Sequence, residues 1–141
     1  MSILDSIELF SSLTSSERET LSLFCQERLL RSGEILFNEG DDALAFYVVK
    51  SGYIRVYKDR SDGEKLVGYV DSGGLVGEMA LFDPDAPKNR MATAKAAEDT
   101  YLLVIMDYAI LELSRKHEDI YKKISDIIMV RKNDNKKNNI E

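Results

Sequence analysis

The chain has one cysteine, one histidine and no tryptophan among its 141 residues. A lone cysteine, Cys25, excludes an internal disulfide and any metal site built from several cysteines. The only histidine, His117, lies in a charged segment and is interpreted as a solvated or capping side chain. No serine lies in a nucleophile-elbow pattern, and neither an HxxxH nor a CxxC motif occurs. We therefore expect that the chain is not an enzyme and that it holds no metal.

Long apolar runs are also missing. No segment approaches the roughly 18 apolar residues of a membrane span, and the N-terminus lacks the basic-then-apolar pattern of a secretory signal. The glycine-rich stretch from Gly73 to Gly77 lacks the Lys-Ser/Thr pair of a nucleotide-hydrolysing loop. With 44% hydrophobic and 31% charged residues, the composition is that of a globular domain. We expect one cytoplasmic domain without a membrane partner.

Basic charge is scarce over most of the chain. Residues 1–114 hold 11 basic and 20 acidic residues, whereas residues 115–141 hold 8 basic and 5 acidic ones. An acidic body does not attract the phosphates of nucleic acid, so no nucleic-acid partner is expected. Acids such as Glu118 and Asp126 interrupt the basic end, which favours a solvated helix face over a phosphate-binding or membrane-binding patch.

The pattern along the chain predicts a helix, then many strands, then helices again. Thr14 followed by Glu17 is a capping-box signal for a helix start. Between Leu29 and Met106, short β-branched and aromatic runs alternate with glycine-containing turns at roughly ten-residue spacing, as in a β-sandwich or jelly roll. Afterwards apolar residues recur at three- and four-residue steps, with a break around His117. We therefore expect two C-terminal helices.

The C-terminal helices are predicted to carry an apolar stripe. Such a stripe must bury against the strands, a partner or a second copy of the chain. Beyond Val130 the sequence is too polar to pack, so we expect residues 131–141 to be frayed or disordered and the domain to span residues 1–130. The stripe consists of Ile120, Ile124, Ile127 and Ile128.

One segment, from Gly77 to Ala96, combines a Gly-Glu pair, a short apolar turn, and an arginine followed by small residues. A sugar phosphodiester needs backbone N–H groups at a helix start, a guanidinium for its anionic oxygens and an acceptor for a ribose hydroxyl. This segment offers all three. In isolation, Arg90 would be read as a surface charge, Gly77 as a turn glycine and Glu78 as an acid favoured at a helix start.

The segment resembles the phosphate-binding cassette of the cyclic nucleotide-binding domain family, which includes catabolite activators, cyclic-nucleotide-dependent kinases and cyclic-nucleotide-gated channels. The stretches from Gly33 to Asp41 and from Phe46 to Val56 resemble the first strands and central hairpin of that family. The resemblance covers about residues 5–130 and implies a β-roll, or jelly roll, with one N-terminal and two C-terminal helices. The matching cassette residues are Gly77, Glu78, Ala80, Leu81, Arg90, Ala92 and Thr93.

The resemblance implies a role for each cassette residue. Arg90 would bind the cyclic phosphate together with the backbone amides of Met79 and Ala80. Glu78 would accept a hydrogen bond from the ribose 2′-hydroxyl, and Gly77 would let the backbone turn tightly against the ligand.

Two further expectations concern the base. Met91 stands where many relatives have the serine or threonine that supports guanine recognition, so cAMP is expected in preference to cGMP. In the family, residues along the last helix close over the base, which makes Tyr121 and Asn135 candidates for a lid. The alternative is an ordinary amphipathic helix packed permanently on the roll.

Together these features predict a small sensor that binds a cyclic nucleotide and regulates a partner protein. Contact with the phosphate would change how the helices from Asp107 to Val130 pack. DNA-binding relatives carry a helix-turn-helix module after this point, and the remaining residues are too few for one, so an effector protein is expected. Two alternatives stay open: a degenerate roll serving as an interaction or dimerisation module, and a receptor for another phosphodiester messenger. A homodimer is also left open.

Overall fold

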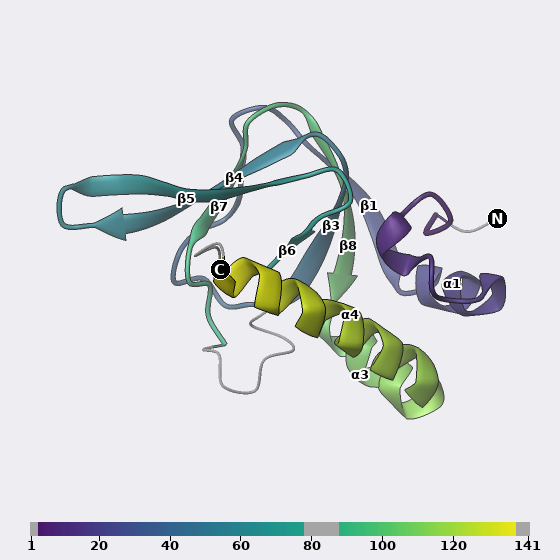
Figure 1. Cartoon of the computed structure of the whole chain (residues 1–141). Helices are drawn as coiled ribbons and strands as arrows, with labels where there is room; N and C mark the ends of the chain where they lie inside the picture. The colour runs from purple at the N-terminus through teal and green to yellow at the C-terminus, as the bar shows by residue number, and fades with distance from the viewer. Residues whose placement is uncertain (1–2, 78–87, 138–141) are drawn as a thin grey trace.

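The computed structural model describes residues 3–77 and 88–137. Within these residues, two antiparallel four-stranded sheets pack face to face as a β-roll, with helices beside it (Figure 1). The first sheet has the order β1-β8-β3-β6 and the second has the order β2-β7-β4-β5. This is the fold that the sequence predicts. The strands are β1 Cys25–Leu30, β2 Ile35–Phe37, β3 Ala45–Ser51, β4 Tyr53–Arg60, β5 Gly63–Asp71, β6 Leu75–Val76, β7 Thr93–Ala96 and β8 Thr100–Met106.

The helices begin and end where local signals place them. Glu17 N–H donates to Thr14 Oγ1 at 3.1 Å, and Thr14 N–H donates to Glu17 Oε1 at 2.8 Å, which confirms the capping box. The break between the last two helices falls at His117, whose φ of −140° and ψ of 66° are not helical. The helical elements are the 3₁₀ turn η1 Glu8–Phe10, α1 Ser15–Ser22, α3 Asp107–Lys116 and α4 Glu118–Lys137.

The first sheet separates two apolar clusters, because successive side chains of a strand point to opposite faces. In β3, Phe46 and Val48 point to the outer face, whereas Tyr47 and Val49 point between the sheets. We call the two groups the outer cluster and the inner cluster. The buried residues of the inner cluster are Leu30, Leu36, Phe37, Ala45, Tyr47, Val49, Ile54, Val56, Val76, Ala92, Ala94, Ala96 and Leu102. The outer cluster joins this face to α1, α3 and α4; its buried residues are Leu4, Ile7, Phe10, Leu13, Leu21, Phe46, Val48, Leu75, Leu103, Ile105, Leu113, Ile120 and Ile124.

The last helix agrees with the sequence pattern in its first part and extends beyond residue 130. Ile120 and Ile124 are buried in the outer cluster, as the predicted stripe requires. The segment 131–137, where the sequence predicts a frayed or disordered tail, continues α4 as helix. Lysine and arginine are good helix formers, and extending an existing helix is far easier than starting one. The domain boundary at residue 130 and the fraying of the tail stay predictions. Of the helices described, none is long and apolar enough to cross a membrane.

Candidate functional site

Arg90 lies inside the roll, where its side chain is only 4% exposed. The guanidinium donates two hydrogen bonds to backbone carbonyls. Nη1 lies 3.0 Å from Gly77 O, and Nη2 lies 2.5 Å from Ala45 O at the start of β3. The two ends of the segment recognised in the sequence, Gly77 and Arg90, are therefore in direct contact. A guanidinium stays charged throughout the physiological pH range, so this site places a cation in the protein interior.

Two aromatic rings accompany the guanidinium. Arg90 Cζ lies 4.2 Å from the ring centroid of Phe37 and 5.8 Å from that of Tyr47. The rings are stacked, with centroids 6.1 Å apart and planes inclined by 29°. The negative face of an aromatic ring attracts a cation, and more strongly where water is excluded. Phe37 and Tyr47 therefore stabilise the buried charge of Arg90 from the inner cluster.

The main chain of Arg90 is held by the turn that follows β2. Arg90 N–H donates to Asp41 O at 2.7 Å, and Gly40 N–H donates to Arg90 O at 2.9 Å. Beside them, Ala43 N–H donates to Lys88 O at 3.0 Å. Gly40 has a φ of 92°, in the left-handed region that glycine adopts readily. This turn fixes the backbone from which the Arg90 side chain projects.

Gly77 occupies a position that strongly favours glycine. Its φ is 76°, and a Cβ built there would collide with Arg90 Nη1 and come within 3.4 Å of Phe37 Cε2. A side chain would be strained by its backbone and would also displace the guanidinium. The sequence predicts a glycine at which the backbone turns tightly, and the structure gives Arg90 as its close neighbour. Its contact with a ligand stays a prediction.

The other predicted cassette residues are placed only in part. Glu78, Met79 and Ala80 lie outside the described residues, so their expected contacts with ribose and phosphate stay predictions. Met91 follows Arg90 at the surface and is 36% exposed. Thr93 is buried, and its Oγ1 accepts a hydrogen bond from Glu39 N–H at 2.9 Å.

The lid candidates lie on α4. Tyr121 is half-buried and packs against the outer cluster, on the other side of the first sheet from the Arg90 guanidinium. Asn135 belongs to the last turns of the same helix. A lid made by Tyr121 would therefore need α4 to move from the position it has here. The lid stays a prediction.

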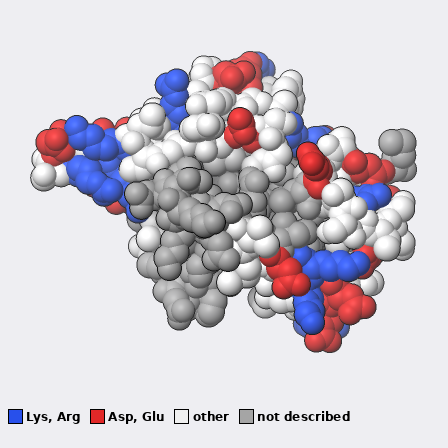
Figure 2. Space-filling model, in the orientation of Figure 1, with Lys and Arg blue, Asp and Glu red and all other residues white. Residues whose placement is uncertain are grey.

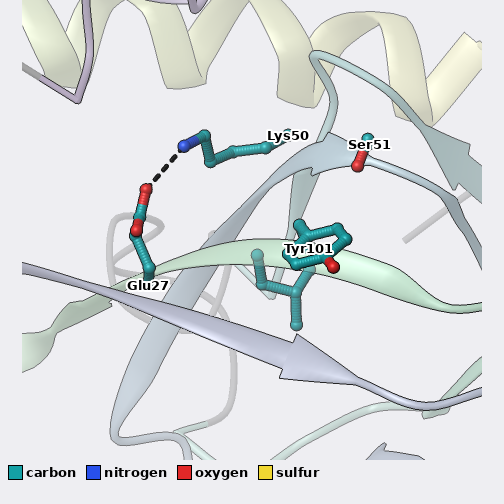
Figure 3. A pocket seen from close by; sticks show the side chains of 5 residues that line it. Glu27, Lys50, Ser51 and Tyr101 are labelled. Carbon is teal, nitrogen blue, oxygen red and sulfur yellow. Dashed lines mark hydrogen bonds and ion pairs between the residues drawn. The ribbon is translucent and has the colours of Figure 1, made fainter.

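A hollow of about 260 Å³ opens elsewhere, on the outer face of the first sheet (Figure 3). Lys50 Nζ and Glu27 Oε1 form an ion pair at 2.6 Å beside the exposed ring of Tyr101. Lys50 and Ser51 lie at the end of β3, whereas the Arg90 guanidinium binds Ala45 at its start. The hollow is thus separate from the Arg90 site. Its lining residues are Glu27, Lys50, Ser51, Tyr101 and Leu102.

Charges of both signs are mixed on the surface of the described residues that Figure 2 shows. Lys and Arg lie beside Asp and Glu on the face shown in Figure 2, both at the β4–β5 tip on the left and at the lower right. Among the described residues, no three His, Cys, Asp or Glu side chains come together to hold a metal ion. Burial raises the pKa of the Cys25 thiol to about 12, so this cysteine stays protonated.

Known proteins are similar to this chain in sequence and in fold. Residues 27–117 match the family model described as "Cyclic nucleotide-binding domain". The chain is 35% identical over 109 residues to the cyclic AMP receptor protein of Thermus thermophilus, covering 77% of this chain and 49% of that protein. It is 32% identical over 127 residues to the cAMP-dependent protein kinase regulatory subunit of Dictyostelium discoideum, covering 83% and 38% respectively.

A solved structure agrees with these matches. The crystal structure of the Thermus thermophilus catabolite activator protein is similar at a TM-score of 0.75 and 31% identity, covering 89% of this chain and 58% of that one. The chain thus spans about half or less of the two sequence relatives. The family model covers well over half of the chain, and it matches through the region that builds both sheets and carries Arg90. The chain belongs to the cyclic nucleotide-binding domain family.

Proposed function

We propose that the chain binds a cyclic nucleotide, cAMP in preference to cGMP, and acts in the cytoplasm as a regulatory module on a partner protein. The observation that carries this proposal is the guanidinium of Arg90, buried between the sheets and in contact with Gly77. Family membership supports the ligand class, and two relatives carry cyclic AMP in their names.

The chemistry of the buried arginine suits a cyclic phosphate. Removing a guanidinium from water costs several kcal/mol, and pairing it with an anion compensates that loss most strongly. A cyclic phosphodiester carries one negative charge on two exocyclic oxygens, which match the two parallel N–H groups of a guanidinium fork. The gain from pairing charges is large in this environment, because the surrounding inner cluster is apolar.

The proposed preference for adenine depends on Met91. This residue lies at the surface directly after Arg90, and its thioether cannot donate a hydrogen bond. A guanine base would then place polar edge atoms against an apolar side chain, at a cost of roughly 1–3 kcal/mol for each unpaired group.

A route for regulation leads from Gly77 through β6. Gly77 follows β6 directly, and the two residues of β6 point to opposite faces of the first sheet. Val76 belongs to the inner cluster near Arg90, whereas Leu75 packs in the outer cluster with Ile120 and Ile124 of α4. A ligand that moved the backbone at Gly77 would therefore also shift the packing beneath α4. Ligand binding would thereby favour one packing arrangement of α4 over another, and the partner would respond to this shift in population. The size of the shift is limited by the difference in ligand affinity between the two arrangements.

Calorimetric titration of the full chain with cAMP, cGMP and a cyclic dinucleotide tests the proposal. We expect saturable binding of cAMP, with cGMP weaker by about tenfold or more, following the cost of one unpaired polar group. Tighter binding of cGMP would contradict the assigned preference, and tighter binding of the dinucleotide would assign the site to another phosphodiester. Absence of binding for all three would leave an interaction or dimerisation module as the function.

A further inference from the structure

One short stretch of the chain, residues 37–41, holds both the side chain and the main chain of Arg90. Phe37 supplies the ring under the guanidinium, and the following turn supplies the backbone partners Gly40 and Asp41. We propose that Phe37 is a positioning residue for the cyclic phosphate: it keeps the Arg90 guanidinium in place without touching the ligand itself. This inference rests on the proposed function and deepens it.

The guanidinium occupies a narrow slot. The ring of Phe37 lies on one side, with Arg90 Cζ 4.2 Å from its centroid. The backbone of Gly77 lies on another side, so close that a Cβ there would meet both Arg90 Nη1 and Phe37 Cε2. Phe37 itself is 9% exposed and packs in the inner cluster. The slot thus restricts the guanidinium before any ligand arrives.

An aromatic ring does something here that an aliphatic side chain of similar size would not do. Leucine could fill the space in the inner cluster, but it has no negative face to attract a cation. A cation–π contact corresponds to a factor of about two to five in an equilibrium constant at an exposed site, and to about thirty where water is excluded. Without that attraction the guanidinium would be held less firmly beside its carbonyl partners, and a binding phosphate would have to supply more of the cost of ordering it. Phe37 therefore raises affinity through preorganisation.

The turn after Phe37 makes this arrangement rigid. Asp41 N–H donates to Asn38 O at 3.0 Å, and Asn38 N–H donates to Asp41 Oδ2 at 2.9 Å, so the turn is closed from both ends. The same turn pairs with the main chain of Arg90 through Gly40 and Asp41. The ring of Phe37 and the Cα of Arg90 consequently keep a fixed relation, which a contact between two separate loops would not ensure.

Three variants of the full chain separate positioning from general packing. Phe37→Leu removes the ring, Phe37→Tyr keeps it, and Ile54→Val loosens the same inner cluster from β4. In calorimetric titrations with cAMP we expect Phe37→Leu to bind about three- to thirtyfold more weakly than the unmodified chain. Phe37→Tyr and Ile54→Val should stay within about twofold of it. Wild-type affinity in Phe37→Leu, or an equal loss in Ile54→Val, would overturn the proposal.

A measurement without nucleotide tests the position of the guanidinium directly. In the ligand-free chain the Nε–H resonance of Arg90, assigned by its loss in Arg90→Lys, should be shifted by the ring current of Phe37. The shift should persist in Phe37→Tyr and disappear in Phe37→Leu. An unshifted Arg90 resonance in the unmodified chain would overturn the inference even if cAMP binds. If no cyclic nucleotide binds, the proposed function and the phosphate role of Phe37 both fail, while the ring-current shift still decides whether Phe37 holds Arg90.

Discussion

At the residue scale, Gly77 and Arg90 depend on each other. The backbone at Gly77 has a φ of 76° and leaves room for the guanidinium because it carries no Cβ. The guanidinium in turn donates to the carbonyl of that glycine at 3.0 Å. A change at either position should therefore affect the other, and nucleotide binding should reveal it.

We predict that Gly77→Ala weakens cAMP binding by at least tenfold, because its methyl group would displace the guanidinium. Gly73→Ala is the matched control: Gly73 has a φ of 89°, but nothing lies within 4 Å of a Cβ built there. Backbone strain of roughly 1 kcal/mol should lower the melting temperature of both variants. Only Gly77→Ala should lose affinity in the titration; equal affinities in the two variants would show that the Gly77–Arg90 contact has no role in binding.

The sequence predicted the pair Gly77 and Arg90 through the motif, but not what surrounds the guanidinium. Phe37 and Tyr47 come from strands of different sheets, and alternation along each strand shows only that they share the interior. Which interior side chains meet across two sheets depends on the register and twist of both, and no local pattern encodes these. The burial of Arg90 could not be read from its neighbours in the sequence either, because Asn89 and Met91 do not form an apolar segment around it.

At the element scale, an ion pair joins the first helix to the last. Lys123 Nζ on α4 lies 2.8 Å from Oε1 of Glu17, the same carboxylate that caps α1 through Thr14. The hydrogen bond from Lys123 is the largest of the causes that hold the pKa of Glu17 below its ordinary value of 4.5. The charge of Glu17 is therefore more stable in the folded chain than in the unfolded one.

This shift gives a pH-dependent prediction. A carboxylate whose pKa is lowered by folding contributes stability above its unfolded pKa, and the contribution is lost as the pH falls through its folded pKa. At pH 7 we expect Glu17→Gln to lower the melting temperature by a few degrees, and the difference from the unmodified chain should shrink below about pH 4. Glu19→Gln, an exposed change on the same helix, should have little effect at either pH. A difference for Glu17→Gln that is constant with pH would contradict the role of its charge.

The sequence defined the elements well wherever a local signal marks their ends. The capping box at Thr14 and the break at His117 both lie where the pattern predicts them. No such signal marks the end of α4, because the residues after Val130 are polar and include no glycine or proline. Polarity suggests fraying of this segment, which stays a prediction, and a polar segment can also continue a helix that packing has already formed.

At the scale of the whole molecule, the first sheet lies between the Arg90 site and the helices. One face contributes Tyr47 and Val76 to the inner cluster, and the other contributes Phe46 and Leu75 to the outer cluster beneath the helices. The two clusters share strands, and we propose that a displacement on one face is transmitted through these strands to the other. This arrangement is the physical basis of the proposed regulation.

Hydrogen exchange tests that coupling. If cAMP changes the packing of the last helix, backbone amides from Ile120 to Asn135 in α4 should exchange more slowly at saturating cAMP than in its absence. Amides of the β4–β5 hairpin tip, from Asp59 to Glu64, serve as the internal reference and should change little. Unchanged exchange along α4 at saturation would leave a static binding module without a helical switch.

The central claim, that Arg90 binds a cyclic phosphate, is tested most directly by titrating cAMP into the unmodified chain, Arg90→Ala and Arg55→Ala. Arg55 is an exposed arginine on β4 and controls for general charge. Losing the partner of a desolvated anion costs roughly 2–5 kcal/mol, so Arg90→Ala should bind at least about thirtyfold more weakly while Arg55→Ala binds normally. Thermal melting will show whether each variant is folded. Arg90→Lys keeps the charge but not the guanidinium fork, so its affinity for cAMP should lie between that of Arg90→Ala and that of the unmodified chain. Folded Arg90→Ala that binds cAMP as tightly as the unmodified chain would contradict the account.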